Sequence, residues 1–384
     1  AATELGMYAS FDDGAHWQPL QMNLPRTSVR DIDVHDDDVV IATHGRGFWV
    51  LDDVASLRQL GDDGSLGETK LFVPSTAIRV RPSGFTGTPL PKEEPVAANP
   101  PFGARLDYVL ATTPKQPLRL TIRDGQGQVV RSYSSADAPP AHDLATIDAM
   151  PEWYPPPSML RTTPGWHRFV WPLRYPAPPA SAQGNAYSEG VWAPPGHYSV
   201  ELDVDGKTWR QPLDVVPDPR VHLPAEAYAQ QFTLAREVEA AQARLAQAQS
   251  EEKAWHKALG NERKGADLSL RVAIDAFDDK LVAIDGLTQT ANPNNAWAFP
   301  PKSTSTLVFV ADGLDKLLAA VDDADAAPTT DARTGYARML PMLDGVLAAW
   351  ERLKTTDLAA LNARLKEAGK PMLDEKTIDA EKAQ

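Results

Sequence analysis

The prolines of this 384-residue chain divide it into three parts, and this division limits the fold more than any other feature. Most of the 34 prolines lie between residues 74 and 224. Proline lacks a backbone donor and breaks helices, so this middle part favours short strands, turns and extended connections. The sequence therefore predicts several domains, with β-structure in the first two thirds and long helices after the last prolines.

A motif near the N-terminus, S-x-D-x-G-x-x-W, is formed by Ser10, Asp12, Gly14 and Trp17. Residues 6–11 before the turn have the composition of a strand. The Asp12 carboxylate can accept hydrogen bonds from backbone N–H groups, and Gly14 tolerates a positive φ. Trp17 begins the returning strand and can pack over the turn. The motif thus predicts a hairpin in which Asp12 stabilises the turn and does not contact a substrate.

The residues after this motif have the alternation of short strands. Residues 29–35 alternate apolar and polar side chains, as expected for a half-buried strand, and residues 39–43, apolar up to Ala42, are expected to form a buried strand. Turn-forming residues at 45–47 precede a further strand over 48–51. The pattern predicts about four short strands in one β-sheet, the content of one propeller blade.

The motif is that of Asp-box, or BNR, repeats. In addition, residues 42–53, ATHGRGFWVLDD, resemble the closing segment of large bacterial BNR-repeat proteins described as sortilin-like or glycosyl-hydrolase-like. The resemblance implies that residues 1–60 are the last blade of a β-propeller and that the protein is periplasmic or secreted. A propeller needs roughly 4–8 blades. Since the motif occurs once, we expect a C-terminal portion whose partner is the remainder of the same propeller protein.

Three functional hypotheses follow from this resemblance. In the first, the chain is a non-catalytic accessory region that braces the propeller and presents a surface for a protein, peptide or glycan. In the second, it is the accessory end of a propeller glycoside hydrolase, sialidase-like or glucanase-like, whose active site lies in other blades. In the third, it is an independent three-domain protein, and its first segment pairs with another sheet. Further Asp-boxes with clustered arginine, tyrosine and glutamate would favour the enzyme.

The middle of the chain predicts a linker and a second β domain. Residues 61–101 are expected to be a linker, and residues 102–217 a β-sandwich that resembles immunoglobulin or fibronectin type III modules. An Asp-Gly pair at 205–206 predicts a hairpin turn. The expected strands cover residues 104–110, 118–123, 129–133, 167–171, 197–204 and 207–216.

Residues 218–384 are expected to form an antiparallel helical bundle. Apolar side chains recur at steps of three and four residues, which is typical of amphipathic helices. Phe277 and Trp350 lie on such apolar stripes and are predicted to be buried in the bundle. The stripes cover residues 232–248, 270–284, 307–321, 336–350 and 358–365.

Composition excludes several kinds of partner. The formal net charge is −14, which disfavours binding to nucleic acid and docking on an anionic membrane, because both need clustered basic residues. The chain has no cysteine, so disulfides and thiol chemistry are excluded. No apolar run reaches the length of a membrane-spanning helix, and no membrane insertion is expected.

Two groups of residues are candidates for binding. His44 and Arg46 lie in a glycine-flanked turn, where they could bind an anion, or where Arg46 could pair with an aspartate of the blade. Trp153, Tyr154 and Trp166 could form stacking platforms for sugars or peptides, or could fill the core and fasten the loops. The sequence leaves both interpretations open.

No catalytic residues, cofactor or metal are predicted. The motifs G-x-S-x-G and H-E-x-x-H are absent, and Gly125-Gln126-Gly127 is a single G-x-G in an expected hairpin. The histidines include no pair four residues apart that could face one metal ion. The aspartates between residues 31 and 38 could suggest calcium, but they lack EF-hand spacing.

Overall fold

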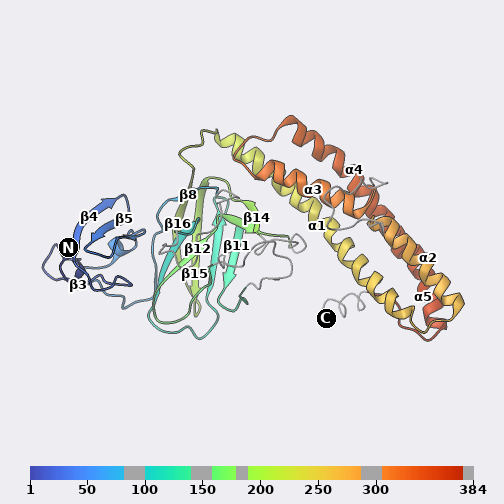
Figure 1. Ribbon diagram of the computed structural model, residues 1–384, viewed down its shortest axis with the longest axis horizontal. Helices are drawn as coiled ribbons and strands as arrows, with labels where there is room; N and C mark the ends of the chain where they lie inside the picture. Colours follow the sequence, from blue (N-terminus) through green and yellow to red (C-terminus); the bar gives the residue numbers. More distant parts are fainter. Residues whose placement is uncertain (82–99, 140–157, 179–188, 287–304, 375–384) are drawn as a thin grey trace. The chain divides into compact units, whose positions relative to one another are not determined.

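The computed structural model describes residues 1–81, 100–139, 158–178, 189–286 and 305–374 (Figure 1). The protein is of mixed β and α class, with strands up to residue 217 and helices from residue 225 onwards. One compact unit consists of Ala1–Pro176 with Ala193–His222, and the other of Ala177–Trp192 with Leu223–Gln384. The predicted order of β-structure followed by helices is therefore confirmed.

Two small antiparallel sheets form the N-terminal region. The first contains β1 (Ala2–Thr3), β2 (Gly6–Ala9) and β3 (Gln18–Pro19). The second contains β4 (Val29–His35), β5 (Asp38–Thr43) and β6 (Phe48–Leu51), at the positions that the alternation predicts. The expected single four-stranded sheet is wrong, because the strands divide into two sheets around the loop that joins β3 to β4.

The core of this region shows why the strands divide. Leu24 of the connecting loop is buried with Met7 of β2 and with Val29 and Ile41 of the second sheet. The registers Ile32↔Ile41 and Ile41↔Trp49 place these three side chains on the same face, where they meet that core. Both sheets thus pack their apolar side chains around the connecting loop.

Two further sheets occupy the rest of the first unit. One has the order β11 (Val129–Ser134), β10 (Arg119–Asp124), β15 (Gly196–Val204), β16 (Lys207–Pro217) and β8 (Ala77–Arg79). The other has the order β12 (Gly165–Trp171), β9 (Ala104–Leu110) and β7 (Lys70–Leu71). β13 (Arg174–Pro176) follows β12. All pairs are antiparallel except β16 with β8.

Aromatic rings join these two sheets. Tyr133 of β11 meets Phe169 of β12 with ring centroids 4.7 Å apart, and Trp171 of β12 meets Tyr198 of β15 at 5.4 Å. Phe169 and Trp171 are fully buried, as expected for strands that alternate inward and outward side chains. The predicted strands are confirmed here, and the hairpin at residues 205–206 joins β15 to β16.

The expected linker over 61–101 needs correction. Its described part supplies β7 to the three-stranded sheet and β8 to the five-stranded sheet. Leu71, Phe72 and Ala77 are buried there. These strands are two and three residues long, too short to show period-two alternation in the sequence. Residues 82–99 lie outside the described part of the chain.

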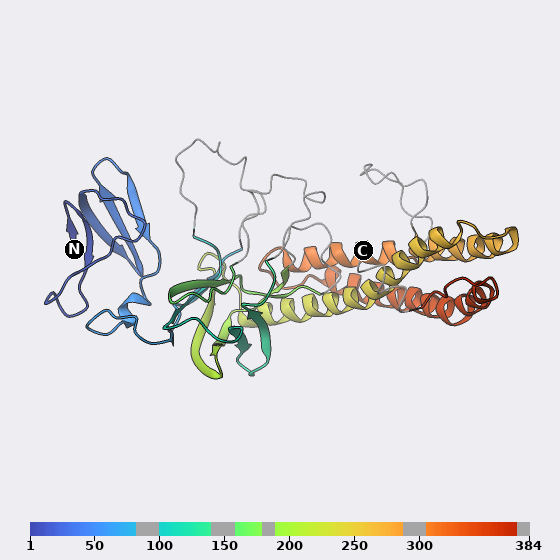
Figure 2. The same ribbon diagram turned by 90° about the horizontal axis from the view of Figure 1, so that it is seen from below.

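The second unit contains β14 (Glu189–Trp192) and the helices. The helices are α1 (Ala225–Glu262), α2 (Leu268–Asp285), α3 (Leu307–Asp322), α4 (Thr330–Arg352) and α5 (Leu358–Glu367). α1 packs against α2, α3 and α4, and α5 packs against α2 (Figure 2). The apolar stripes in the sequence match these helices.

Local sequence fixes the helix ends and the buried stripe. Asp267 and Thr306 cap α2 and α3 by accepting hydrogen bonds from backbone N–H groups, and Gly286 ends α2 at a φ of 87°. Phe277 and Trp350 are buried, as predicted. Trp350 stacks on Trp255 of α1 at 5.1 Å, and its indole N–H donates to Glu251 at 3.0 Å.

Candidate interaction surface

The Asp-box residues close one tight turn between β2 and β3. Asp12 Oδ1 accepts from the His16 backbone N–H at 2.8 Å and from the Ser10 hydroxyl at 2.9 Å. The Ser10 Oγ in turn accepts from the Gly14 N–H at 2.7 Å, and the Trp17 indole donates to the Gly14 carbonyl at 3.1 Å. Gly14 has a φ of 92°, which favours glycine. Every polar group of the motif is therefore used inside the turn.

The charge of Asp12 is stabilised by these contacts. The pKa of Asp12 is lowered to about 2, first by the His16 backbone N–H and then by the His16 ring and the Ser10 hydroxyl. A carboxylate that already accepts from three donors has little capacity left for a ligand. This arrangement agrees with a turn-stabilising role for Asp12.

His44 and Arg46 lie at the exposed tip of the β5–β6 hairpin. The tip is held by the backbone, since the Thr43 N–H donates to the Gly47 carbonyl at 3.1 Å and the Trp49 indole to the Arg46 carbonyl at 3.0 Å. Within the described ranges, the side chains of His44 and Arg46 make no hydrogen bond or ion pair. The structure thus does not contain the Arg46–aspartate pair that was one interpretation of this turn.

Trp166 has a packing role in the structure. It lies on β12, and its ring stacks on Phe72 with centroids 4.5 Å apart and an interplanar angle of 24°. Phe72 is fully buried beneath it. Trp153 and Tyr154 lie outside the described residues. Among those described, no ring contact or hydrogen bond joins Trp166 to His44 or Arg46.

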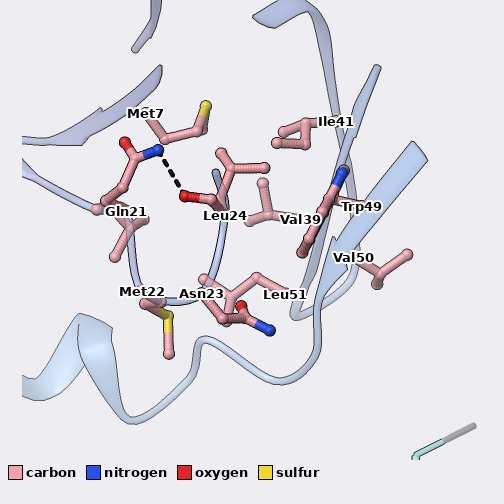
Figure 3. A pocket seen from close by; sticks show the side chains of 11 residues that line it. Met7, Gln21, Met22, Asn23, Leu24, Val39, Ile41, Trp49, Val50 and Leu51 are labelled. Carbon is pink, nitrogen blue, oxygen red and sulfur yellow. Dashed lines mark hydrogen bonds between the residues drawn. The ribbon is translucent and has the colours of Figure 1, made fainter. Parts of the chain in front are cut away.

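An open apolar pocket lies between the two N-terminal sheets (Figure 3). Residues 20–24 form one side, and Val39, Ile41, Trp49 and Leu51 form the other. Its cavity volume is about 80 Å³. The Gln21 side-chain amide donates to the Leu24 carbonyl at 2.7 Å and thereby holds the loop beside the pocket. Sequence reasoning missed this pocket, because it depends on a contact between a loop and a distant strand.

The second sheet also carries apolar side chains on its other face. Val50 points away from the other pocket residues in Figure 3 and is 53% exposed, and Phe48 on the same face is 81% exposed. Met22 at the rim of the pocket is 72% exposed. Soluble proteins rarely leave large apolar side chains grouped in water unless the surface binds something. The continuous apolar run at 39–42 is the sequence signal for a strand that is apolar on both faces.

A buried ionic network holds the end of β6. Arg168 forms a two-point ion pair with Asp107, with both nitrogen–oxygen distances 2.8 Å, and its other donors reach the carbonyls of Asp52 and Asp53 at 2.9 Å. The hydrogen bonds to Asp107 raise the pKa of Arg168. Ser75 donates to the buried Asp53 carboxylate at 2.7 Å. The chain that leaves β6 is therefore held in one position.

A buried carboxyl group with a raised pKa lies among the helices. Burial of Glu252 on α1 raises its pKa to about 7, and the charge of Asp285 adds to this effect. Burial also raises the pKa of Glu239, which accepts from the Val191 N–H at 2.8 Å. In the described parts of the chain, no group of three or more His, Asp or Glu side chains could hold a metal ion. Both carboxyl groups have structural neighbours that explain their pKa values.

No family model matches the chain, and no curated protein matches it. In the described residues, no helix has both the length and the apolar character needed to cross a membrane.

Proposed function

We propose that this chain is a non-catalytic interaction region of a large extracytoplasmic β-propeller protein. Residues 1–60, although divided into two three-stranded sheets, would form the terminal blade together with the remainder of the propeller. The chain would brace the propeller and present a surface for a protein, peptide or glycan. The exposed apolar side chains of Phe48 and Val50 on one face of the β4–β6 sheet, and of Met22 at the rim of the pocket on the other, carry this proposal, because grouped apolar side chains in water mark a surface that binds something.

The geometry of the Asp-box supports the blade. Its four residues bond to one another within a hairpin turn, as a repeated structural motif requires. Propeller blades pack on neighbours through both faces of each sheet. Apolar side chains on both faces of the β4–β6 sheet agree with that arrangement. The extracytoplasmic location rests on the resemblance of residues 42–53 to BNR-repeat proteins.

The other parts of the chain would serve as supports. We propose an immunoglobulin-like or fibronectin-like β-sandwich for residues 102–217, supported by the ring contacts between the five- and three-stranded sheets. The Arg168 network would fix the blade to this sandwich. An antiparallel bundle of helices would follow from residue 218 onwards.

Hydroxyl-radical footprinting tests this function on the protein isolated from its natural source, with the 384-residue chain as the reference. We expect Phe48 and Met22 to be oxidised quickly in the 384-residue chain and several-fold more slowly in the natural protein, where another polypeptide covers them. Leu268, 80% exposed on α2, is the internal control and should react equally in both.

Equal oxidation of Phe48 and Met22 in the two samples, with Leu268 also equal, would overturn the proposal. In that case the N-terminal sheets would be exposed in the natural protein, and the region would not be a covered blade.

A further inference from the structure

β6 has a free edge. It is the last strand of its sheet, and among the described strands it pairs only with β5. The Thr43 N–H donates to the Gly47 carbonyl, so hydrogen-bonded pairs fall at alternate positions of this ladder. By this alternation the backbone N–H and C=O groups of Trp49 and Leu51 form hydrogen bonds with β5, whereas those of Phe48 and Val50 point away from β5. A row of outward donors and acceptors is a template for another strand.

The apolar pocket opens beside this edge. Trp49 and Leu51 of β6 line it together with residues 20–24 (Figure 3). A strand added to β6 would place every second side chain on the same face as Trp49 and Leu51. These side chains would point into the pocket, and the intervening ones would lie beside Phe48 and Val50. Strand edges with adjacent pockets are a recurring way to bind extended peptides.

Opposite charges flank the edge. Arg46 precedes β6 with an exposed, unpaired side chain in the described structure, and Asp52 follows β6. In an extended strand, these two residues are about 20 Å apart. An antiparallel strand beside β6 would begin near Asp52 and end near Arg46. The added strand that best complements these two charges has a basic residue at its start, beside Asp52, and an acidic residue about six positions later, beside Arg46.

The geometry points to an extended peptide as the occupant of this site, bound as an additional antiparallel strand on β6. Its alternate apolar side chains enter the pocket, a basic residue lies beside Asp52, and an acidic residue lies beside Arg46. This inference rests on the proposed function and narrows its ligand from protein, peptide or glycan to a polypeptide strand.

A synthetic peptide tests the inference directly on the 384-residue chain. The probe is lysine-leucine-valine-leucine-valine-threonine-glutamate, acetylated at its N-terminus and labelled with fluorescein after a C-terminal glycine spacer. Binding is followed by fluorescence anisotropy. We expect saturable binding, and weaker binding of a peptide in which the terminal lysine and glutamate exchange places.

N-methylated peptides separate backbone pairing from apolar adsorption. Methylating both valines removes the two donors that face Phe48 and Val50, and should weaken binding about tenfold. Methylating both leucines is the matched control, because their N–H groups point away from β6; this peptide should bind like the parent. Equal binding of all three peptides would overturn strand addition.

A protein variant tests the same contact from the other side. Val50→Pro removes an outward N–H group and leaves the β5–β6 hydrogen bonds intact, since proline is tolerated on such edges. Val50→Thr keeps the N–H and the branched shape. We expect peptide binding to be lost in Val50→Pro and retained in Val50→Thr. If Val50→Pro does not fold, the N-methylated peptides still distinguish strand addition from apolar adsorption.

Two other outcomes are informative. If no peptide binds and the chain instead associates with itself in a manner that Val50→Pro abolishes, the occupant is a second copy, and the peptide inference is wrong. If the peptide binds as expected but footprinting shows Phe48 and Met22 exposed in the natural protein, the site stands and the proposed blade function fails.

Discussion

At the scale of single residues, some charged side chains stabilise turns, and others have no partner in the described structure. Asp12 accepts from the His16 N–H and from Ser10, and its pKa is lowered to about 2 as a result. Arg46 is exposed and has no ion-pair partner in the described structure. The fold accounts for the charge of Asp12, whereas the charge of Arg46 is free to contact a ligand.

Replacing Asp12 by alanine should lower the melting temperature by a few degrees, because the turn loses its acceptor. Asp12→Asn should retain more stability, since an amide oxygen also accepts from the His16 N–H. The pKa of Asp12 is below its usual value, so its contribution is present above about pH 4 and is lost as the pH falls towards 2. Thermal melts at pH 7 and pH 2.5 measure this, and an unchanged melt of Asp12→Ala at pH 7 would contradict it.

The contribution of Glu252 to stability changes with pH in the opposite direction to that of Asp12. Its pKa is raised to about 7, so the folded protein binds the proton more tightly than the unfolded chain does. Stability should fall as the pH rises from about 4.5 to 7. Glu252→Gln mimics the protonated form and should stabilise the protein at pH 8 by about 1–3 kcal/mol, with almost no effect at pH 4.

Denaturant unfolding of both proteins at pH 4 and pH 8 measures the effect of Glu252→Gln. A variant that is less stable than the original at pH 8 would show that the ionised carboxylate has a stabilising partner instead.

At the scale of elements, the sequence predicted most strands and helices because their patterns are local, although α1 (Ala225–Glu262) extends well beyond the predicted stripe at 232–248. The β4–β6 strands and the five α-helices follow apolar alternation and stripes of three and four residues. β7 and β8 were missed because strands of two or three residues are too short to show period-two alternation. The split into two sheets was missed because it depends on Leu24, a loop residue that packs far from its neighbours in sequence.

The candidate site was predicted only in part. The Asp-box turn could be predicted, because its donors and acceptors lie within eight residues of one another. The pocket could not, because it forms only when residues 20–24 meet Trp49 and Leu51. Trp166 could be assigned to packing only when its stacking on Phe72 was known.

The buried stripe of the helices gives a prediction for stability. Phe277→Ala and Trp350→Ala should each cost about 3–5 kcal/mol in the free energy of unfolding, because each leaves a cavity among packed helices. Trp350→Ala also removes the indole donor from Glu251. Leu268→Ala on the exposed side of α2 is the control and should be nearly neutral. Near-neutral results for both buried positions would mean that these helices do not pack as described.

At the scale of the whole molecule, we propose that the N-terminal sheets recognise a partner and that the remainder of the chain supports them. The acidic net charge of −14 and the apolar pocket with its free strand edge favour a peptide over nucleic acid or an anionic membrane. The Arg168 network holds the chain directly after β6 through the carbonyls of Asp52 and Asp53.

We expect that the 384-residue chain does not hydrolyse sialosides, β-glucans or esters. The sequence lacks G-x-S-x-G and H-E-x-x-H, and the Asp-box carboxylate is engaged in its turn. Product release from chromogenic substrates of each class, measured with excess protein, checks this. Turnover that a single carboxylate substitution abolishes would refute the non-catalytic interpretation.

The central claim is that the β4–β6 sheet is a surface for another polypeptide. An experimental structure of the protein isolated from its natural source tests it most directly. The account predicts that a strand pairs with the outer edge of β6 and that the side chains of Phe48 and Val50 are buried against polypeptide. A structure in which this edge is unpaired and both side chains face solvent would contradict the claim.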